Sequence, residues 1–401
     1  MSSLSVIRRS LRGLQGGGVL YPISLVMALG SGMVNLGLVF YLRDFYQAPA
    51  GVIGSLSACQ FLMYFLGCSL LRPLSGRLSP QRSLLVAASC LGGIALGIRL
   101  VPSLPLTFVL YGLFGYAFSL FWPPLMGWLS MGLEGKALNR VIAHYNLSWS
   151  SGVIISPYLT GLLAQHHPAL PLALAGPLFL ACAVAIFKLP PAPGAVSMRD
   201  RQEGAGDGEL SRDASTHLRF PAWVGVFSAY AAISVMITIF PVYAQEHLGS
   251  SKSQVGLLLL IRALFVALGF MLMGRTHFWH FTIWPILLGQ AVLAVLMALM
   301  PLARSLAWFI PALALLGLVM AYQNTSSVFH GVTGSVRRER RMAIHEATLT
   351  FGQILGAGAG GFIYQHASMA VVFLFLLALA VLGAGLQALM VRYAKRAAAS
   401  R

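Results

Sequence analysis

Arg262 is the residue whose position most strongly implies chemistry, because it lies inside the apolar run LLLLIRALFVALGF. At a rise of about 1.5 Å per residue, its place in that run puts the guanidinium near the middle of a bilayer, too deep to reach the interface. A charge at that depth costs about 3 kcal/mol or more and must meet water, a carboxylate or a ligand. The sequence therefore predicts that Arg262 anchors an anionic group or takes part in a conformational switch. The alternative is a structural pair with a polar neighbour.

Two histidines and one glutamate could carry protons. His345 and Glu346 begin another apolar span, and His144 occupies the matching place about two hundred residues earlier. Imidazole and carboxyl groups near a helix end can exchange protons with solvent. For Glu346 there is a structural alternative, because an acid in the first turn of a helix interacts favourably with the helix dipole and can pair with Arg338 or Arg341.

The segment that contains His144 occurs twice in the chain. Arg140 and His144 recur as Arg341 and His345 at an offset of 201, and a second set of anchors recurs at an offset of 200. This second set pairs Gly152, Gly161, Gln165 and His166 with Gly352, Gly361, Gln365 and His366. A self-match at half the chain length, inside apolar segments, is typical of a duplicated helical bundle.

Composition places both copies in a membrane. The chain has 401 residues, of which 58% are hydrophobic and 9% charged, and its mean hydropathy is +0.79. Backbone groups find no hydrogen-bond partners in hydrocarbon, so apolar runs of about 20 residues predict membrane-spanning helices. We count twelve, near 20–41, 51–71, 83–101, 105–130, 141–164, 169–188, 221–244, 253–273, 281–302, 306–330, 342–365 and 367–391.

The expected fold is therefore an all-α integral membrane protein with twelve transmembrane helices arranged as two six-helix bundles. The predicted domains are an N-terminal bundle over 1–188, a cytoplasmic linker over 189–220 and a C-terminal bundle over 221–401. The linker is polar and holds five of the ten acidic residues, which is typical of a flexible segment.

The basic residues predict the orientation. Of the 27 Lys and Arg residues, 22 fall on the side that receives both termini and the linker, four fall on the other side, and Arg262 lies within a span. By the positive-inside rule both termini are cytoplasmic. This segregation also argues that the net charge of +17 serves membrane orientation and not nucleic-acid binding.

These features resemble the major facilitator superfamily of secondary transporters. The resemblance rests on six plus six spans, a long central linker and a basic turn after the second span. That turn reads Gly76-Arg77-Leu78-Ser79-Pro80-Gln81-Arg82, with Pro80 where the superfamily has an acid. The Phe121-Trp122-Pro123-Pro124 run and the His345-Glu346-Ala347 segment look like bacterial members.

The resemblance implies a central site lined by the first, fourth, seventh and tenth spans. On these spans it indicates six substrate-binding candidates, which join Arg262: Asn35, Tyr111, Trp122, Tyr322, Gln323 and Asn324. For each, interhelical packing and hydrogen bonding is the alternative role. The resemblance also implies that Arg77 and Arg341 act in gating. His144, His345 and Glu346 remain the candidates for proton coupling or gating. Pro123 and Pro124 should kink the fourth span.

Other motif matches lie in surroundings where the corresponding site cannot form. Gly356-x-Gly358-x-x-Gly361 spells a dinucleotide fingerprint but lies inside a span with no preceding strand. Gly352, Gly356 and Gly360 are better explained as a small-residue face for close helix packing. Because we find no ATP-binding loop, metal-ligand pattern or nucleophile elbow in the sequence, we expect neither catalysis nor a cofactor.

The sequence therefore predicts a secondary active transporter of the inner membrane that moves a small organic solute by alternating access. A monomer in the lipid bilayer is expected, with protons as the candidate coupling ion. Helices one and four carry no carboxylate at depth, and Arg262 favours an anionic or neutral amphipathic solute. The alternative function is a transport-inactive membrane scaffold or sensor.

Overall fold

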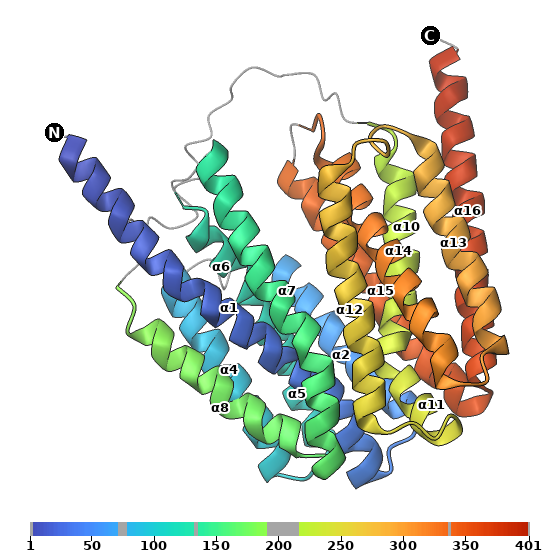
Figure 1. Cartoon of the computed structure of the whole chain (residues 1–401), viewed down its shortest axis with the longest axis horizontal. Helices are drawn as coiled ribbons and strands as arrows, with labels where there is room; N and C mark the ends of the chain where they lie inside the picture. Colours follow the sequence, from blue (N-terminus) through green and yellow to red (C-terminus); the bar gives the residue numbers. More distant parts are fainter. Residues whose placement is uncertain (1–2, 71–77, 132–134, 191–215, 336–337, 400–401) are drawn as a thin grey trace. The chain divides into compact units, whose positions relative to one another are not determined.

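The computed structural model describes residues 3–70, 78–131, 135–190, 216–335 and 338–399, and every regular element in these ranges is a helix (Figure 1). The chain divides into two compact units. The first comprises Met1–Leu38 and Met63–Gly208, and the second comprises Val39–Leu62 and Glu209–Arg401. Two helices, α1 (Ser3–Tyr46) and α2 (Ala50–Ser69), contribute to both. The domain boundaries expected from the sequence, 188 and 221, stay a prediction.

The first unit otherwise contains α4 (Pro80–Leu100), α5 (Leu104–Ser119), α6 (Trp122–Leu129), α7 (Gly135–His166) and α8 (Leu170–Phe187). Helix α4 packs closely against α8. A Cβ added to Gly92 would lie 2.8 Å from the Leu180 side chain, and one added to Gly176 would lie 2.6 Å from Leu96. The two helices therefore approach at glycines, where each admits a leucine from the other.

The predicted kink in the fourth span is present as a break between α5 and α6. Pro124 has no N–H, so it cannot donate to the carbonyl of Leu120, its partner in a continuous helix. The hydroxyl of Ser83 on α4 donates to that carbonyl instead, at 2.7 Å. The proline pair thus ends α5 and starts α6. The Leu120 carbonyl, which loses its partner at the break, is hydrogen-bonded by α4 instead.

The second unit contains eight further helical segments: α10 (Arg219–Thr238), α11 (Phe240–His247), α12 (Lys252–Arg275), α13 (Ile283–Leu299), the 3₁₀ turn η1 (Met300–Leu302), α14 (Leu306–Val332), α15 (Arg338–His366) and α16 (Met369–Ala399). Helix α10 packs against α15, α14 and α16, and α12 packs against α14. Pro241 lacks the N–H that a continuous helix would need, and the predicted span over 221–244 breaks at Ile239 into α10 and α11.

Glycines bring α15 against α10, as the small-residue interpretation predicted. A Cβ added to Gly352 would lie 2.4 Å from the carbonyl oxygen of Phe227, and one added to Gly356 would lie 2.2 Å from that of Ala231. One turn further, a Cβ on Gly360 would lie 2.8 Å from the Val235 side chain. The two backbones are therefore in contact at Gly352 and Gly356, and Gly360 makes room for a valine side chain of α10.

Buried amides attach α16 to α10. Gln290 of α13 donates to the hydroxyl of Ser228 at 3.1 Å and to the carbonyl of Ala380 at 2.9 Å. Gln387 of α16 donates to the carbonyl of Pro221 at 2.8 Å. Both glutamines are fully buried, and these bonds satisfy their Nε2 donors, whereas their Oε1 atoms have no hydrogen-bond partner among the described residues.

Eleven helices within the described residues are long and apolar enough to cross a membrane. Helix α15, the predicted eleventh span, is not among them, although it is 29 residues long. It begins with the charged residues Arg338-Glu339-Arg340-Arg341, and its middle is rich in glycine, so its hydropathy is low. The expected total of twelve thus stays a prediction, while the all-helical membrane architecture is present.

Candidate functional site

Tyr230 lies at the centre of a polar cluster in the second unit. Its hydroxyl donates to Oδ1 of Asn324 at 3.0 Å, which joins α10 to α14. Tyr230 also interacts electrostatically with Arg262 of α12 and with Glu346 of α15. Four helices therefore each contribute one polar or charged group, and three of these four groups are residues that the sequence predicted.

Arg262 is buried among the helices of the second unit. Only 7% of the residue is exposed, and its Nε has no hydrogen-bond partner among the described residues. Its helix packs closely on α14, since a Cβ added to Gly317 would lie 2.5 Å from the carbonyl oxygen of Arg262. A buried guanidinium with an unused donor can bind an anionic group that enters the cluster.

Glu346 is the ninth residue of α15, which begins at Arg338. It is therefore past the first turn, and the favourable interaction with the helix dipole that was the structural alternative does not apply to it. Its side chain is half-buried, and it interacts electrostatically with Tyr230.

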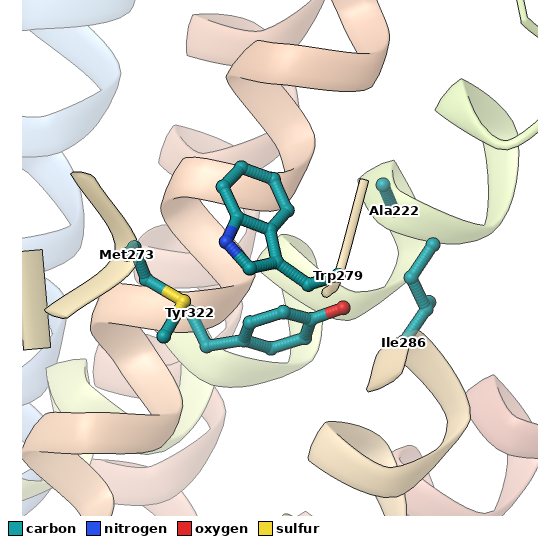
Figure 2. Close-up of a cluster of buried hydrophobic side chains, with 5 residues drawn as sticks. All are labelled: Ala222, Met273, Trp279, Ile286 and Tyr322. Atoms are coloured by element: carbon teal, nitrogen blue, oxygen red, sulfur yellow. The ribbon is translucent and has the colours of Figure 1, made fainter. Parts of the chain in front are cut away.

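Tyr322 and Gln323 have different neighbours from Asn324, the next residue of α14. Tyr322 belongs to a buried apolar cluster with Ala222, Met273, Trp279 and Ile286, and its ring lies beside the Trp279 indole (Figure 2). Gln323 is fully buried, and a Cβ added to Gly225 of α10 would lie 2.0 Å from its Oε1. Both residues pack between helices, whereas Asn324 joins the cluster around Tyr230.

The two predicted proton-carrying histidines occupy different surroundings despite their matching places in the repeat. His345 is 3% exposed, and its Nδ1 forms a 2.7 Å hydrogen bond with the hydroxyl of Ser327. His144 is exposed, and its Nδ1 donates to the carbonyl of Arg140 at 2.8 Å. One histidine is thus part of a buried helix contact, and the other is open to exchange.

In the first unit, Asn35 and Tyr111 form a pair of the same kind as Tyr230 and Asn324. The Tyr111 hydroxyl donates to Oδ1 of Asn35 at 2.9 Å and joins α5 to α1. Trp122, the first residue of α6, packs edge-on against Tyr145 and Trp149 of α7, with ring centroids 6.5 Å apart in both pairs. All three rings are half-buried, so they present an aromatic surface.

The remaining gating candidates are placed as follows. Arg341 lies in the first turn of α15 and is half-buried. Arg77 lies outside the described residues.

Sequence reasoning missed Tyr230, because the candidates on the cavity-lining spans came from the first, fourth and tenth spans alone. A signal was available, since Tyr230 is the one tyrosine between Arg219 and Thr238, and the seventh span was expected to line the cavity too. Tyr145 and Trp149 were missed as well, because their contact with Trp122 depends on how α6 starts after the proline break.

The fold and this cluster define a polytopic membrane protein of the transporter class, with buried polar groups where several helices meet. A family model described as Major Facilitator Superfamily matches residues 20–333. The chain therefore belongs to the major facilitator superfamily, and it is a membrane transporter and not an enzyme.

Solved structures agree on the fold. A crystal structure of the nucleoside transporter NupG has a TM-score of 0.76 at 12% identity, covering 94% of this chain and 99% of that chain. A bacterial homologue of the human lysosomal transporter Spinster, in an inward-facing and occupied conformation, has a TM-score of 0.75 at 13% identity and covers 96% and 97%. A POT family transporter in complex with a thioalcohol-conjugated peptide has a TM-score of 0.73 at 12% identity and covers 94% and 96%. No curated protein matches the sequence.

Proposed function

We propose that the chain is a secondary active transporter that binds a small organic solute at the cluster formed by Tyr230, Arg262, Asn324 and Glu346. The observation that carries the proposal is the buried Arg262, whose Nε has no hydrogen-bond partner among the described residues. Such a charge is retained inside a membrane protein when it meets a ligand or a switch partner. An anionic solute, or a neutral one with a strong acceptor, fits this requirement.

The solute class is also supported by the neighbouring folds. They include a nucleoside transporter and POT family transporters solved with a conjugated peptide and with 5-aminolevulinic acid. These ligands are small and carry several hydrogen-bonding groups, as the tyrosine, asparagine and arginine of the cluster would require.

Protons are the proposed coupling ion, with Glu346 as the carrier. Its carboxyl group interacts with Tyr230, which also interacts with Arg262, so protonation would change the charge that this arginine experiences. His345 is engaged with Ser327, which favours a packing role, and the exposed His144 would exchange protons outside the cluster. The protein is proposed to act as a monomer in the inner membrane with both termini cytoplasmic.

The binding proposal is tested by thermal unfolding of the purified protein with a panel of organic carboxylates and nucleosides. We expect at least one carboxylate to raise the melting temperature, and Arg262→Gln to abolish that rise. The matched control is Arg275→Gln, because Arg275 lies on the same helix but is exposed. If Arg262→Gln retains the full rise, Arg262 does not bind the solute. If no compound is bound or transported in proteoliposomes, a scaffold or sensor is the better interpretation.

A further inference from the structure

The outward faces of α13 and α16 end in aromatic and basic residues that the proposed solute site does not use. The two helices lie side by side in the second unit (Figure 1). Ile286, near the start of α13, clusters with Ala222 of α10. Gln387, in the later part of α16, donates to the carbonyl of Pro221 of the same helix α10. The two helices therefore run in opposite directions, and in the predicted topology this end of the pair is cytoplasmic.

Each helix presents an exposed apolar face. On α13, Trp284 and Leu288 lie one turn apart and are 74% and 64% exposed. On α16 the exposed face runs through Leu382, Leu386 and Leu389, whose spacing of four and three puts them on one side of a helix. Both helices are long and apolar enough to span a membrane, so these leucines contact acyl chains, which are as apolar as leucine itself.

The two faces reach the predicted membrane surface at the same level. A Cβ added to Gly383 of α16 would lie 2.7 Å from Nε2 of Gln290 of α13, so these two residues are opposite each other. Trp284 precedes Gln290 by as many residues as Leu389 follows Gly383, which is roughly 9 Å along each helix axis. Trp284 is therefore level with Leu389. Arg392 lies one turn beyond them, roughly 4.5 Å further out.

The outer end of the pair is basic and aromatic. Arg392 is exposed, and Tyr393 beside it is 73% exposed. The sequence has no acid between Glu246 and Glu339 and none after Glu346, so neither helix, nor the loop before α13, carries a negative charge. An exposed guanidinium at a membrane surface, on helices without carboxylates, attracts phosphate groups.

Buried contacts hold this surface in place. Gln290 joins α13 to α16 through the carbonyl of Ala380, and Gln387 joins α16 to α10. In the loop before α13, Trp279 is 2% exposed and packs in the apolar cluster of Figure 2. Its Nε1 donates to the carbonyl of Thr276 at 3.0 Å, which fixes the path of the loop. The surface is therefore preformed, and a ligand needs to order little of it on binding.

We propose that the cytoplasmic ends of α13 and α16 form a binding site for an anionic phospholipid. Arg392 binds the headgroup phosphate, and the leucine faces of the two helices contact the acyl chains. Trp284 and Tyr393 lie between them, at the level of the glycerol and ester groups, where tryptophan and tyrosine are enriched in membrane proteins. The order of leucine, aromatic ring and arginine along the helices thus matches the order of groups along a phospholipid. The site uses no residue of the cluster around Tyr230, so it is independent of the solute.

Native mass spectrometry of the full chain in a neutral detergent tests the proposal without any solute. It measures the affinity for the first bound dioleoyl phosphatidylglycerol, with dioleoyl phosphatidylcholine as the zwitterionic comparison. The variants are Arg392→Gln and Trp284→Ala. Their matched controls are Arg304→Gln and Trp308→Ala, because Arg304 and Trp308 are exposed residues of the same unit at the opposite predicted surface. Gel filtration and thermal unfolding show whether each variant is folded.

We expect the unmodified protein to bind phosphatidylglycerol about fivefold more tightly than phosphatidylcholine, which is the contribution of one base near a membrane surface. Arg392→Gln should remove this preference, and Trp284→Ala should weaken the binding of both lipids. Both controls should bind as the unmodified protein does. Equal affinity of the unmodified protein for the two lipids, or a preference that survives in folded Arg392→Gln, would overturn the proposal.

Glycerol phosphate, which has the charge of the headgroup but no acyl chains, distinguishes a lipid site from a site for free anions. In excess it should leave phosphatidylglycerol bound, because the leucine faces contribute to the affinity for the lipid alone. Complete displacement would show that the site recognises a free anion, and the phospholipid assignment would be wrong.

Discussion

The hydroxyl of Tyr230 donates to Oδ1 of Asn324 at 3.0 Å, and this bond joins the predicted seventh and tenth spans. In the first unit Tyr111 and Asn35 form the same kind of bond between the predicted fourth and first spans. The two pairs place their residues in opposite order: the tyrosine belongs to the fourth span in one unit and to the seventh in the other. The surroundings differ too, because only Tyr230 has interactions with both Arg262 and Glu346.

Tyr230→Phe should therefore affect function more than stability. Removing one hydrogen bond between membrane helices costs about 0.6 kcal/mol on average, so the variant should fold. The rise in melting temperature caused by a bound carboxylate should fall by more than half, because the variant lacks the hydroxyl that bonds Asn324 and interacts with Arg262.

Tyr111→Phe is the matched control for this experiment. It removes the same type of bond in the first unit and should keep most of the carboxylate-dependent rise. If both variants lose the rise to the same degree, Tyr230 has no special part in binding.

Replacing two glycines of α15 by alanine should change the stability of the protein in opposite directions. At Gly356 the new Cβ would lie 2.2 Å from the carbonyl oxygen of Ala231, so α10 and α15 must move apart. Overpacking of this kind costs about 1–3 kcal/mol. At Gly358 the new Cβ would lie 3.6 Å from Ala58, an ordinary contact, and alanine is favoured over glycine in a helix by about 0.5–1 kcal/mol.

Thermal unfolding of the purified variants measures this difference. Gly356→Ala should lower the melting temperature, and Gly358→Ala should leave it unchanged or raise it. A loss of stability in Gly358→Ala equal to that in Gly356→Ala would contradict the assignment of Gly356 to the contact with α10.

The sequence predicted the helical membrane fold well because the length of each hydrophobic run is a property of a short segment, and because the repeat can be found by comparing two such segments directly. It did not predict the neighbours of Tyr322 and Gln323, since Trp279 comes from the segment between α12 and α13 and Gly225 from α10. Nor did the sequence indicate that His144 and His345 would differ in exposure. The two histidines occupy matching positions in the repeat, but His144 is exposed and His345 is buried.

The break in the fourth span shows where sequence and structure complement each other. Pro123 and Pro124 predicted the interruption, but no local pattern indicated that Ser83 would bond the freed carbonyl of Leu120. Such long-range partners depend on how α4 packs against α5, which is set by contacts that are distant along the chain.

Ser83→Ala should therefore destabilise the first unit. The variant leaves the buried carbonyl of Leu120 without its donor, and an unsatisfied buried group costs about 1–3 kcal/mol. Ser130→Ala is the control, because the Met126 carbonyl bonded by that hydroxyl also accepts the backbone N–H of Ser130. Thermal unfolding should show a clear loss for Ser83→Ala and little change for the control; equal losses would mean that the Ser83 bond is not what stabilises the break.

Glu346→Gln tests the proposed proton carrier. Uptake of a carboxylate identified by thermal unfolding is measured in proteoliposomes with and without an imposed pH gradient. The gradient should stimulate uptake by the unmodified protein, because in the proposed mechanism Glu346 carries a proton together with the solute. Glutamine keeps the shape of the side chain but cannot ionise, so uptake by the variant should be the same with and without the gradient.

His144→Asn serves as the control for a titratable group outside the cluster, since His144 is exposed and bonds its own helix through Arg140. It should keep the full stimulation. Stimulation that persists in Glu346→Gln but disappears in His144→Asn would transfer the carrier role to the histidine. An unmodified protein that takes up the carboxylate equally well at every gradient would exclude proton coupling altogether, while leaving the binding of the solute at Arg262 to be judged by the unfolding experiment.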